Sequence, residues 1–175
     1  MPHPPRTATH ARPSDPHGAP APKVLAPNEG EARRVLADLV TTKLTARETG
    51  GAYSLFETRT APWGAALRQR LNEVDATFVV LEGSYAVRVG DRVRSVGVGG
   101  VVFVPRGTVH SYANLGATPA RMLVVASPAG AHERFYAEAG APPVGGPSGP
   151  GGGPPDVAPV IAAAARQGIE MLPAE

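Results

Sequence analysis

Residues 99–114 read GGVVFVPRGTVHSYAN, and this stretch decides the fold. A run of β-forming residues ends at Pro105, because proline cannot donate a hydrogen bond to a strand ladder. The glycine two residues later permits a tight turn. A second strand then begins, and strand alternation predicts that His110, Tyr112 and Asn114 share one face. The stretch therefore predicts two consecutive strands, the second of which carries a histidine on a face shared with two other polar side chains.

Short apolar runs continue on both sides of this stretch. They are rich in Val, Tyr, Phe and Thr, and turn residues separate them: YSLFETR, TFVVLEG, YAVRVG, RVRSVG, VVFVP, HSYAN and RMLVVASP. Regular spacing of this kind predicts an all-β sandwich or barrel of antiparallel strands. Within residues 82–96, apolar side chains at 85, 87 and 89 alternate with others, and Gly90-Asp91 predicts the turn of a hairpin.

Composition divides the chain into four parts. Residues 1–22 are rich in proline and poor in large apolar side chains, so they are predicted to be a disordered arm. Residues 23–140 hold the predicted barrel, and residues 141–155 are predicted to be a flexible Gly/Pro-rich linker. Residues 156–175 are predicted to form a C-terminal helix that docks on the barrel. The expected docking side chains are Val160, Ile161 and Ala164.

Two further segments have less decisive patterns. EARRVLADLV, residues 31–40, is compatible with a short helix or with a strand. HERFYAEAG, residues 132–140, has helix-forming residues followed by glycine, which predicts a helix that closes the barrel. His132 is expected to be exposed at the start of that helix.

Composition and charge argue against several classes of function. The net charge is +2, and no Lys or Arg run is interleaved with aromatic residues, so nucleic-acid binding is not expected. No cysteine is present, which excludes disulfides, thiolate ligands and a cysteine nucleophile. No apolar run approaches the ~20 residues of a membrane span, and the N-terminus lacks a signal-peptide pattern. A cytoplasmic protein without membrane contact is therefore expected.

The stretch from Gly99 resembles the second sequence signature of the cupins. Gly99, Pro105, Gly107, His110 and Asn114 match that signature in residue type and in spacing. The predicted barrel and the last helix are similar to small single-domain cupins related to quercetin dioxygenases. The resemblance implies a double-stranded β-helix, or jelly-roll, barrel with a pocket inside. It also implies that His110 occupies the position of a metal ligand.

The first cupin signature ends at Gly83 and here lacks its metal ligands. Metal-binding cupins place two histidines and a glutamate before that glycine. The corresponding positions here hold no such residues: Ala76 for the glutamate, and either Arg70 with Asn72 or Gln69 with Leu71 for the histidines. Mononuclear metal sites need three or four ligands, usually imidazole and carboxylate. The departure from the family pattern therefore predicts that no metal cofactor is bound.

A divalent metal (Fe, Ni, Mn or Zn) is expected only if residues outside the family pattern are recruited. Glu73 and Asp75 could enter the barrel through a one-residue register slip. Such a slip turns every side chain of a strand to the other face and would expose Phe78 and Val80.

The candidate site therefore consists of His110 and the residues expected to line the barrel around it. His110 is the candidate general acid or base, because a neutral imidazole with a pKa near ~6.5 suits that work. Alternatively, it is a core histidine held by hydrogen bonds. The candidate ligand-binding residues are Gln69, Arg70, Tyr112, Asn114 and Phe78. Arg68 and Arg70 share one strand face, Gln69 and Leu71 share the other, and the sequence leaves open which pair faces the pocket.

Three functions are compatible with these patterns. The first is a cupin that has lost its metal and binds a small organic molecule, aromatic or polyketide-like, with metal-independent acid–base chemistry of the isomerase or cyclase type. The second is a metal-dependent, quercetinase-like dioxygenase. The third is a non-catalytic ligand-binding or scaffold protein. A homodimer is expected, because the sheet edges would otherwise be exposed.

Overall fold

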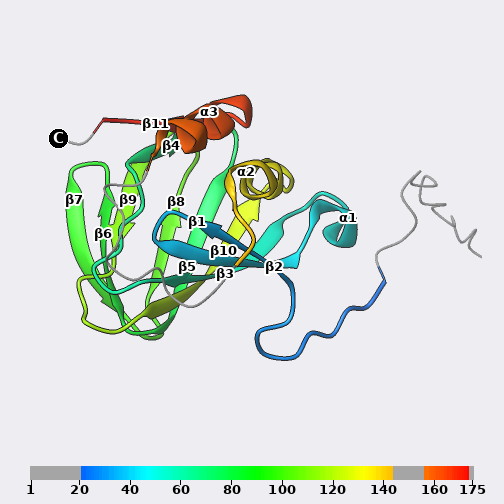
Figure 1. Ribbon diagram of the computed structural model, residues 1–175, viewed down its shortest axis with the longest axis horizontal. Helices are drawn as coiled ribbons and strands as arrows, with labels where there is room; N and C mark the ends of the chain where they lie inside the picture. The colour runs from blue at the N-terminus through cyan, green and yellow to red at the C-terminus, as the bar shows by residue number, and fades with distance from the viewer. Residues whose placement is uncertain (1–20, 144–155, 174–175) are drawn as a thin grey trace, which may run out of the picture.

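The computed structural model describes residues 21–143 and 156–173, which form two facing antiparallel sheets (Figure 1). The strands are β1 (Glu31–Val35), β2 (Asp38–Leu44), β3 (Ser54–Thr60), β4 (Gln69–Leu71), β5 (Asp75–Glu82), β6 (Ser84–Val89), β7 (Arg92–Gly97), β8 (Val101–Val104), β9 (Val109–Ala113), β10 (Ala120–Ser127) and β11 (Ile169–Met171). The helices are α1 (Ala46–Thr49), α2 (Ala131–Ala139) and α3 (Ala158–Arg166). One sheet has the order β1-β2-β3-β10-β5-β8 and the other β11-β4-β9-β6-β7. The predicted all-β jelly-roll barrel is confirmed.

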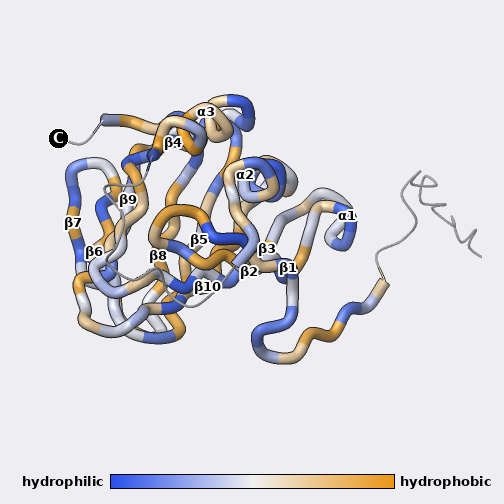
Figure 2. Tube along the Cα trace, viewed as in Figure 1, coloured by the Kyte–Doolittle hydropathy of each residue, from blue (hydrophilic) through white to orange (hydrophobic). Residues whose placement is uncertain are grey.

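Alternation of side chains along the strands builds the core between the sheets. In β5, Ala76, Phe78 and Val80 are buried, while the residues between them are partly exposed. β10 follows the same pattern from Ala120 to Ala126. Figure 2 shows the corresponding changes of hydropathy along the chain. The register of β5 is therefore the one that the sequence predicts, without a slip.

Helices α2 and α3 lie side by side at one end of the barrel (Figure 1). Helix α2 buries His132 and Phe135, which lie one helical turn apart. Helix α3 packs beside α2 and buries Val160, Ala163 and Ala164. Ile161, expected among the docking residues, is instead 41% exposed.

Strands occur in two segments for which the sequence allowed or predicted a helix, residues 31–40 and 156–175. Residues 31–40 span β1, a turn and the start of β2, with Leu36 in the left-handed region at a φ of 51°. Residues 156–175 were predicted to be helical, but after α3 the chain forms β11, which pairs with β4. The predicted disordered arm (except residues 21–22) and most of the predicted linker lie outside the described residues. No helix within the described ranges is long and apolar enough to cross a membrane.

Candidate functional site

The strand register decides which side chains enter the barrel. Gln69 of β4 lies directly opposite His110 of β9, and opposite residues in antiparallel strands point to the same side of a sheet. His110 and Leu71 are 0% and 2% exposed, respectively. Gln69 and Leu71 therefore face the interior, and Arg70 faces outward.

His110 is a buried, neutral histidine with a partner on each ring nitrogen. Its Nε2 lies 3.2 Å from Nε2 of Gln69, and its Nδ1 lies 3.2 Å from the backbone oxygen of Thr108. Because the Gln69 amide nitrogen can only donate, Nε2 of His110 accepts and Nδ1 carries the proton. Burial lowers the pKa of His110, and the hydrogen bond to Thr108 opposes that shift only in part. His110 thus reaches the interior space only through Gln69.

A second group of polar side chains meets around Asp38, the first residue of β2. Tyr112 donates a hydrogen bond to one carboxyl oxygen of Asp38, with an Oη–Oδ2 distance of 2.6 Å. Thr60 donates to the other oxygen, with an Oγ1–Oδ1 distance of 2.6 Å. Tyr85 in turn donates to Thr60 at 3.2 Å. The four residues come from β2, β3, β6 and β9, so both sheets contribute to this network.

Burial sets the protonation of this network. Asp38 is 8% exposed. Desolvation raises the pKa of its carboxyl above the ordinary range, and the hydrogen bonds from Thr60 and Tyr112 oppose that rise. Burial also raises the pKa of Tyr85 to about 12 and that of Tyr112 well above its ordinary value. The phenols therefore stay protonated near neutral pH, while Asp38 is the group of the network that can exchange a proton.

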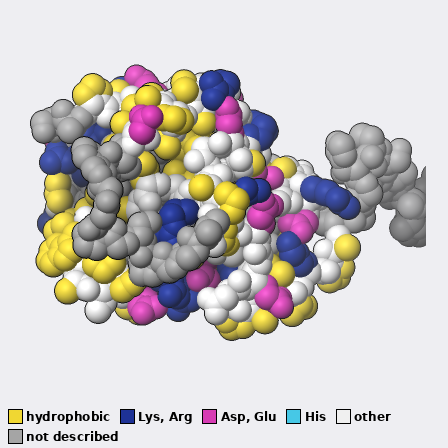
Figure 3. Space-filling model, in the orientation of Figure 1, with side chains coloured by type: hydrophobic (Ala, Val, Ile, Leu, Met, Phe, Trp, Pro, Cys, Tyr) yellow, Lys and Arg dark blue, Asp and Glu magenta, His cyan; other side chains and the backbone are white. Residues whose placement is uncertain are grey.

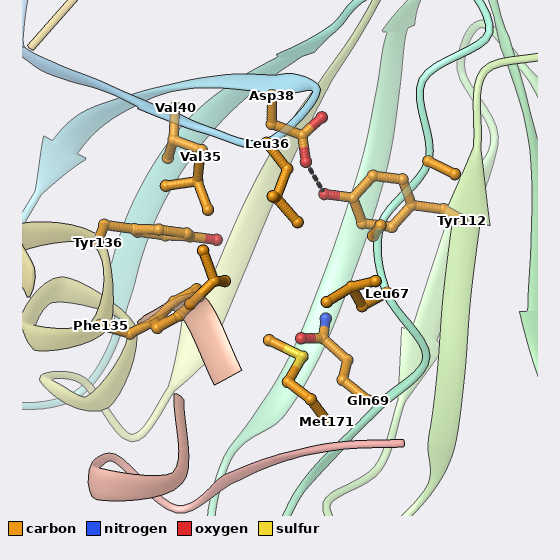
Figure 4. Close-up of a pocket in the computed structure, with 13 residues that line it drawn as sticks. Val35, Leu36, Asp38, Val40, Leu67, Gln69, Tyr112, Phe135, Tyr136 and Met171 are labelled. Atoms are coloured by element: carbon orange, nitrogen blue, oxygen red, sulfur yellow. Dashed lines mark hydrogen bonds between the residues drawn. The ribbon is translucent and has the colours of Figure 1, made fainter. Parts of the chain in front are cut away.

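Asp38 and Tyr112 lie in the wall of a narrow, partly open cavity of about 40 Å³ (Figure 4). In Figure 4 the polar ends of Asp38, Tyr112, Tyr136 and Gln69 converge on this space. The rest of the wall is apolar and includes Val160 of α3 and Met171 of β11. A cavity of this size holds roughly three water molecules.

The structure brings Gln69 and Tyr112 together at the cavity and keeps the other three predicted ligand-binding residues, as well as His110, away from it. Arg70 was predicted to bind the ligand, but it lies on the outer face of β4, where its Nη1 is 3.2 Å from Oε2 of Glu170. Phe78 is a core residue, and its ring packs against His110 and Tyr112.

Asn114 is corrected from a ligand-binding residue to a structural one. Its amide nitrogen lies 2.8 to 3.3 Å from the backbone oxygens of Thr60, Ala61 and Thr118. Its amide oxygen accepts a hydrogen bond from the backbone nitrogen of Gly116 at 2.9 Å. With both ends of the amide used, Asn114 joins loops rather than facing a ligand.

His132 is buried, contrary to the expectation that it is exposed. It is 5% exposed and packs against the rings of Phe56 and Tyr136. Burial, and to a smaller extent the charge of His110, lower its pKa to about 4. Its Nδ1 is buried without a hydrogen-bond partner among the described residues. Neither described histidine is visible on the face shown in Figure 3.

The interior donor set does not fit a metal of the kind that the cupin resemblance implies. The inward positions are Gln69, Leu71, Ala76 and His110, so one imidazole faces one weak amide donor and two side chains without a donor. Glu73 and Asp75 are not available, since β5 keeps its register and Asp75 pairs outward with Arg106 at 2.8 Å. Within the described ranges, no three His, Asp or Glu side chains gather as a metal site.

Asp38 is the functional candidate that sequence reasoning missed. It lies in a segment that the sequence left open between helix and strand, so its direction could not be assigned. The available signal was an acidic residue within an otherwise apolar stretch, VLADLV. A charged residue in such a run is rarely buried without a partner.

The contact between Gln69 and His110 predicts the outcome of one substitution. Gln69→Glu places a carboxylate beside Nε2 and is expected to raise the pKa of His110, because a nearby negative charge favours the protonated imidazole. NMR titration of the histidine ring measures this shift. Arg70→Gln, on the opposite face of β4, is the control and should leave the titration unchanged. An equal response in both variants would contradict the assigned strand faces.

A family model described as a cupin domain matches residues 58–126. One similar solved structure is a predicted oxalate decarboxylase from Thermotoga maritima, with 17% identity, a TM-score of 0.57 and coverage of 60% of this chain and 98% of that one. Another is KdgF from Halomonas sp., with 14% identity, a TM-score of 0.55 and coverage of 62% and 94%. The Cnp3 cupin domain from Schizosaccharomyces pombe has 15% identity, a TM-score of 0.51 and coverage of 59% and 72%. These likenesses concern the fold alone, and the search of curated proteins finds no match.

Proposed function

This chain carries a cupin domain, and from that premise we propose that it binds a small organic carbonyl compound inside the barrel and moves a proton on it without a metal. The observation that carries the proposal is the Asp38–Tyr112 pair at the wall of the interior cavity. A buried carboxyl with a raised pKa is a suitable general base and acid near neutral pH. The lack of a metal donor set around His110 supports chemistry that depends on side chains alone.

The proton transfer is balanced within the site. Asp38 removes a proton from the carbon next to the carbonyl group, and the C–H electron pair forms the enolate. The protonated carboxyl then returns the proton to the same carbon or to another carbon of the conjugated system, which gives exchange or isomerisation. No oxidant, reductant or further reactant is needed.

Two other cavity residues are placed to stabilise the enolate. Gln69 donates one amide hydrogen to His110 and retains a second for the substrate oxygen. The hydroxyl of Tyr136 points into the same space (Figure 4). Hydrogen-bond donors held in a dry site stabilise a developing oxyanion strongly. His110 acts here as a positioning residue, because it orients the Gln69 amide without facing the cavity.

A substrate needs more room than this narrow cavity gives, and the proposal requires the C-terminal segment of its wall to move outward. A small organic ligand needs several hundred Å³, against about 40 Å³ here. Val160 and Met171 reach the cavity from α3 and β11, and β11 is held by a ladder of only three residue pairs with β4. Outward movement of this segment would enlarge the cavity without disturbing the central strands.

Proton exchange into a neutral ketone tests the proposal. The protein is incubated with phenylacetone in deuterated buffer, and loss of the protons next to the carbonyl group is followed by NMR. We expect exchange above the buffer rate, and Asp38→Asn is expected to lower the protein-dependent rate by about 100-fold. Asp91→Asn, in the exposed β6–β7 turn, is the matched control and should keep the full rate.

A second variant separates loss of chemistry from loss of fold. Tyr112→Phe removes the hydrogen bond to Asp38 but keeps the ring. The pKa of Asp38 should rise further, so the acidic limb of the rate profile should move to higher pH. Equal rates in the unmodified protein and a folded Asp38→Asn variant, with melting temperatures as the check on folding, would reject the proposal.

A second candidate function is a barrel without catalysis, favoured by how completely the interior is filled. Phe56, Tyr85, Met122 and His110 are all at most 1% exposed. A core filled in this way is compatible with a non-catalytic scaffold as well as with an enzyme. Absence of both exchange and a ligand-dependent rise in melting temperature would favour this function.

A further inference from the structure

A groove of about 390 Å³ lies away from the cavity beside Asp38, where edge strand β7 of one sheet meets edge strand β8 of the other. β7 is an edge strand of the five-stranded sheet, and β8 is an edge strand of the six-stranded sheet. The groove is formed by these two strands and by β6. It is lined by Val87, Val89, Arg92, Arg94, Val96, Val101, Val102 and Phe103. Its volume falls in the ~300–1,000 Å³ range of small-molecule sites.

Both arginines of β7 point to the inner side of their sheet. Arg94 lies opposite Val87 and Arg92 lies opposite Val89 in the antiparallel β6–β7 pair. Directly opposite residues share a face, and Val87 is a core residue, 5% exposed. Two guanidinium groups therefore stand at the open side of the barrel instead of on its outer surface.

Neither guanidinium has a partner in the part of the chain that the structure describes. No hydrogen bond or ion pair joins Arg92 or Arg94 to a described residue. Every other side chain that lines the groove is apolar. Within the described residues, the two positive charges therefore have no anion beside them, and the valines below them are not covered by another apolar group.

We infer that this groove binds a small organic acid with an apolar body, its carboxylate held by Arg92 and Arg94. The planar guanidinium fork matches a carboxylate, often through two parallel hydrogen bonds. The inward-facing Val87, Val96 and Val102 give the apolar body a surface to cover. Val102 lies opposite the buried Phe78 and faces inward, while Val101 and Phe103, opposite Val79 and Thr77, border the groove from the outer face of their sheet.

The groove is separate from the cavity beside Asp38 but lies on the same inner sheet face. Across the sheet, Gln69 lies opposite His110, His110 opposite Val89, and Val89 opposite Arg92. With neighbouring strands ~4.8 Å apart, Arg92 is about 10 Å from His110 in strand spacing. The inference does not depend on the proposed proton transfer, since it uses none of the residues that carry that chemistry.

Titration with 4-phenylbutyrate, followed by amide NMR of the full chain, tests the inference. We expect shifts concentrated in β7 and β8 and at least tenfold weaker binding of 4-phenylbutyramide, which has no charge. Arg94→Gln should weaken binding of the acid by about tenfold, and the Arg92→Gln/Arg94→Gln pair by more. Added salt should weaken binding in the unmodified protein.

Arg88→Gln is the matched control, since Arg88 is on the same hairpin but lies opposite Val93 on the other sheet face. It removes the same charge and should leave affinity within about twofold. Equal weakening in Arg88→Gln and Arg94→Gln would overturn the inference, because it would indicate a general charge effect. Shifts at Gln69 and Met171 instead of β7 would overturn it as well. So would a change of sedimentation in the arginine variants without acid binding, which would make the groove a contact between two copies.

Discussion

Replacement of Asn114 by alanine is expected to destabilise the protein by about 3 kcal/mol, one of the largest effects of any single substitution in this chain. The side chain joins the backbone oxygens of Thr60, Ala61 and Thr118 to the backbone nitrogen of Gly116. Asn114 is 1% exposed, so water cannot replace these partners at no cost. Urea unfolding followed by circular dichroism gives the free energy directly.

The matched control for Asn114 is Asn72→Ala. Asn72 is exposed, and its side chain has no hydrogen bond among the described residues. The control should change the free energy of unfolding by less than about 0.5 kcal/mol. If Asn114→Ala kept full stability but lost a ligand, Asn114 would belong to a binding site and its assignment as a loop clamp would be wrong.

The second large effect is loss of stability between pH 6.5 and pH 4, which His132 is expected to cause. Burial lowers the pKa of His132 from its ordinary 6.5 to about 4. The native state therefore binds this proton more weakly than the unfolded chain does. The contribution to stability is complete above pH 6.5 and falls by about 1.4 kcal/mol per unit as the pH drops. By pH 4 the loss from this residue is about 3 kcal/mol.

Other titratable groups also affect how the free energy of unfolding depends on pH. His110 has a lowered pKa and adds to the loss. Asp38 has a raised pKa, so it binds a proton more strongly in the native state and opposes the loss as the pH falls. Asp75, whose pKa Arg106 lowers to about 2, contributes only below the ordinary aspartate value of 3.8. The histidines therefore dominate the decline above pH 4.5.

His132→Phe isolates the contribution of His132. Phenylalanine keeps an aromatic ring beside Phe56 and Tyr136 and removes the unpartnered Nδ1. The variant should be at least as stable as the unmodified protein at pH 7, and its stability should fall by about 3 kcal/mol less between pH 6.5 and pH 4. Urea unfolding at several pH values measures both. Parallel profiles for the two proteins would show that another group causes the decline.

The sequence predicted the parts of the fold that depend on local patterns. The hairpin around Gly90-Asp91 forms as predicted, with Val89 opposite Arg92. The turn at Gly107 leads into a strand whose His110 and Tyr112 face inward, as strand alternation required. The choice of Gln69 over Arg70 for the interior was left open, because alternation fixes only which residues share a face. Pairing with β9 was needed to decide between them.

The site itself depends on contacts between distant segments, and these could not be predicted. Asp38 meets Thr60 and Tyr112, which are 22 and 74 residues away in sequence. Its network exists only because β2 and β9 face each other from different sheets. The burial of His132 follows from the orientation of a nine-residue helix, whose sequence alone does not show which turn faces the barrel.

The four sheet edges differ in how the chain connects them, and this gives the barrel two kinetically different sides. β7 and β8 follow each other directly, so their side forms from contacts that are local in sequence. β11 pairs with β4 across about a hundred residues, and loop-closure entropy opposes such a contact until the intervening strands are in place. The side with the groove lined by Arg92 and Arg94 is therefore expected to assemble first. The side with Asp38 is expected to be completed last, when the short edge strand β11 pairs with β4, and β11 is where we expect local opening to require the least free energy.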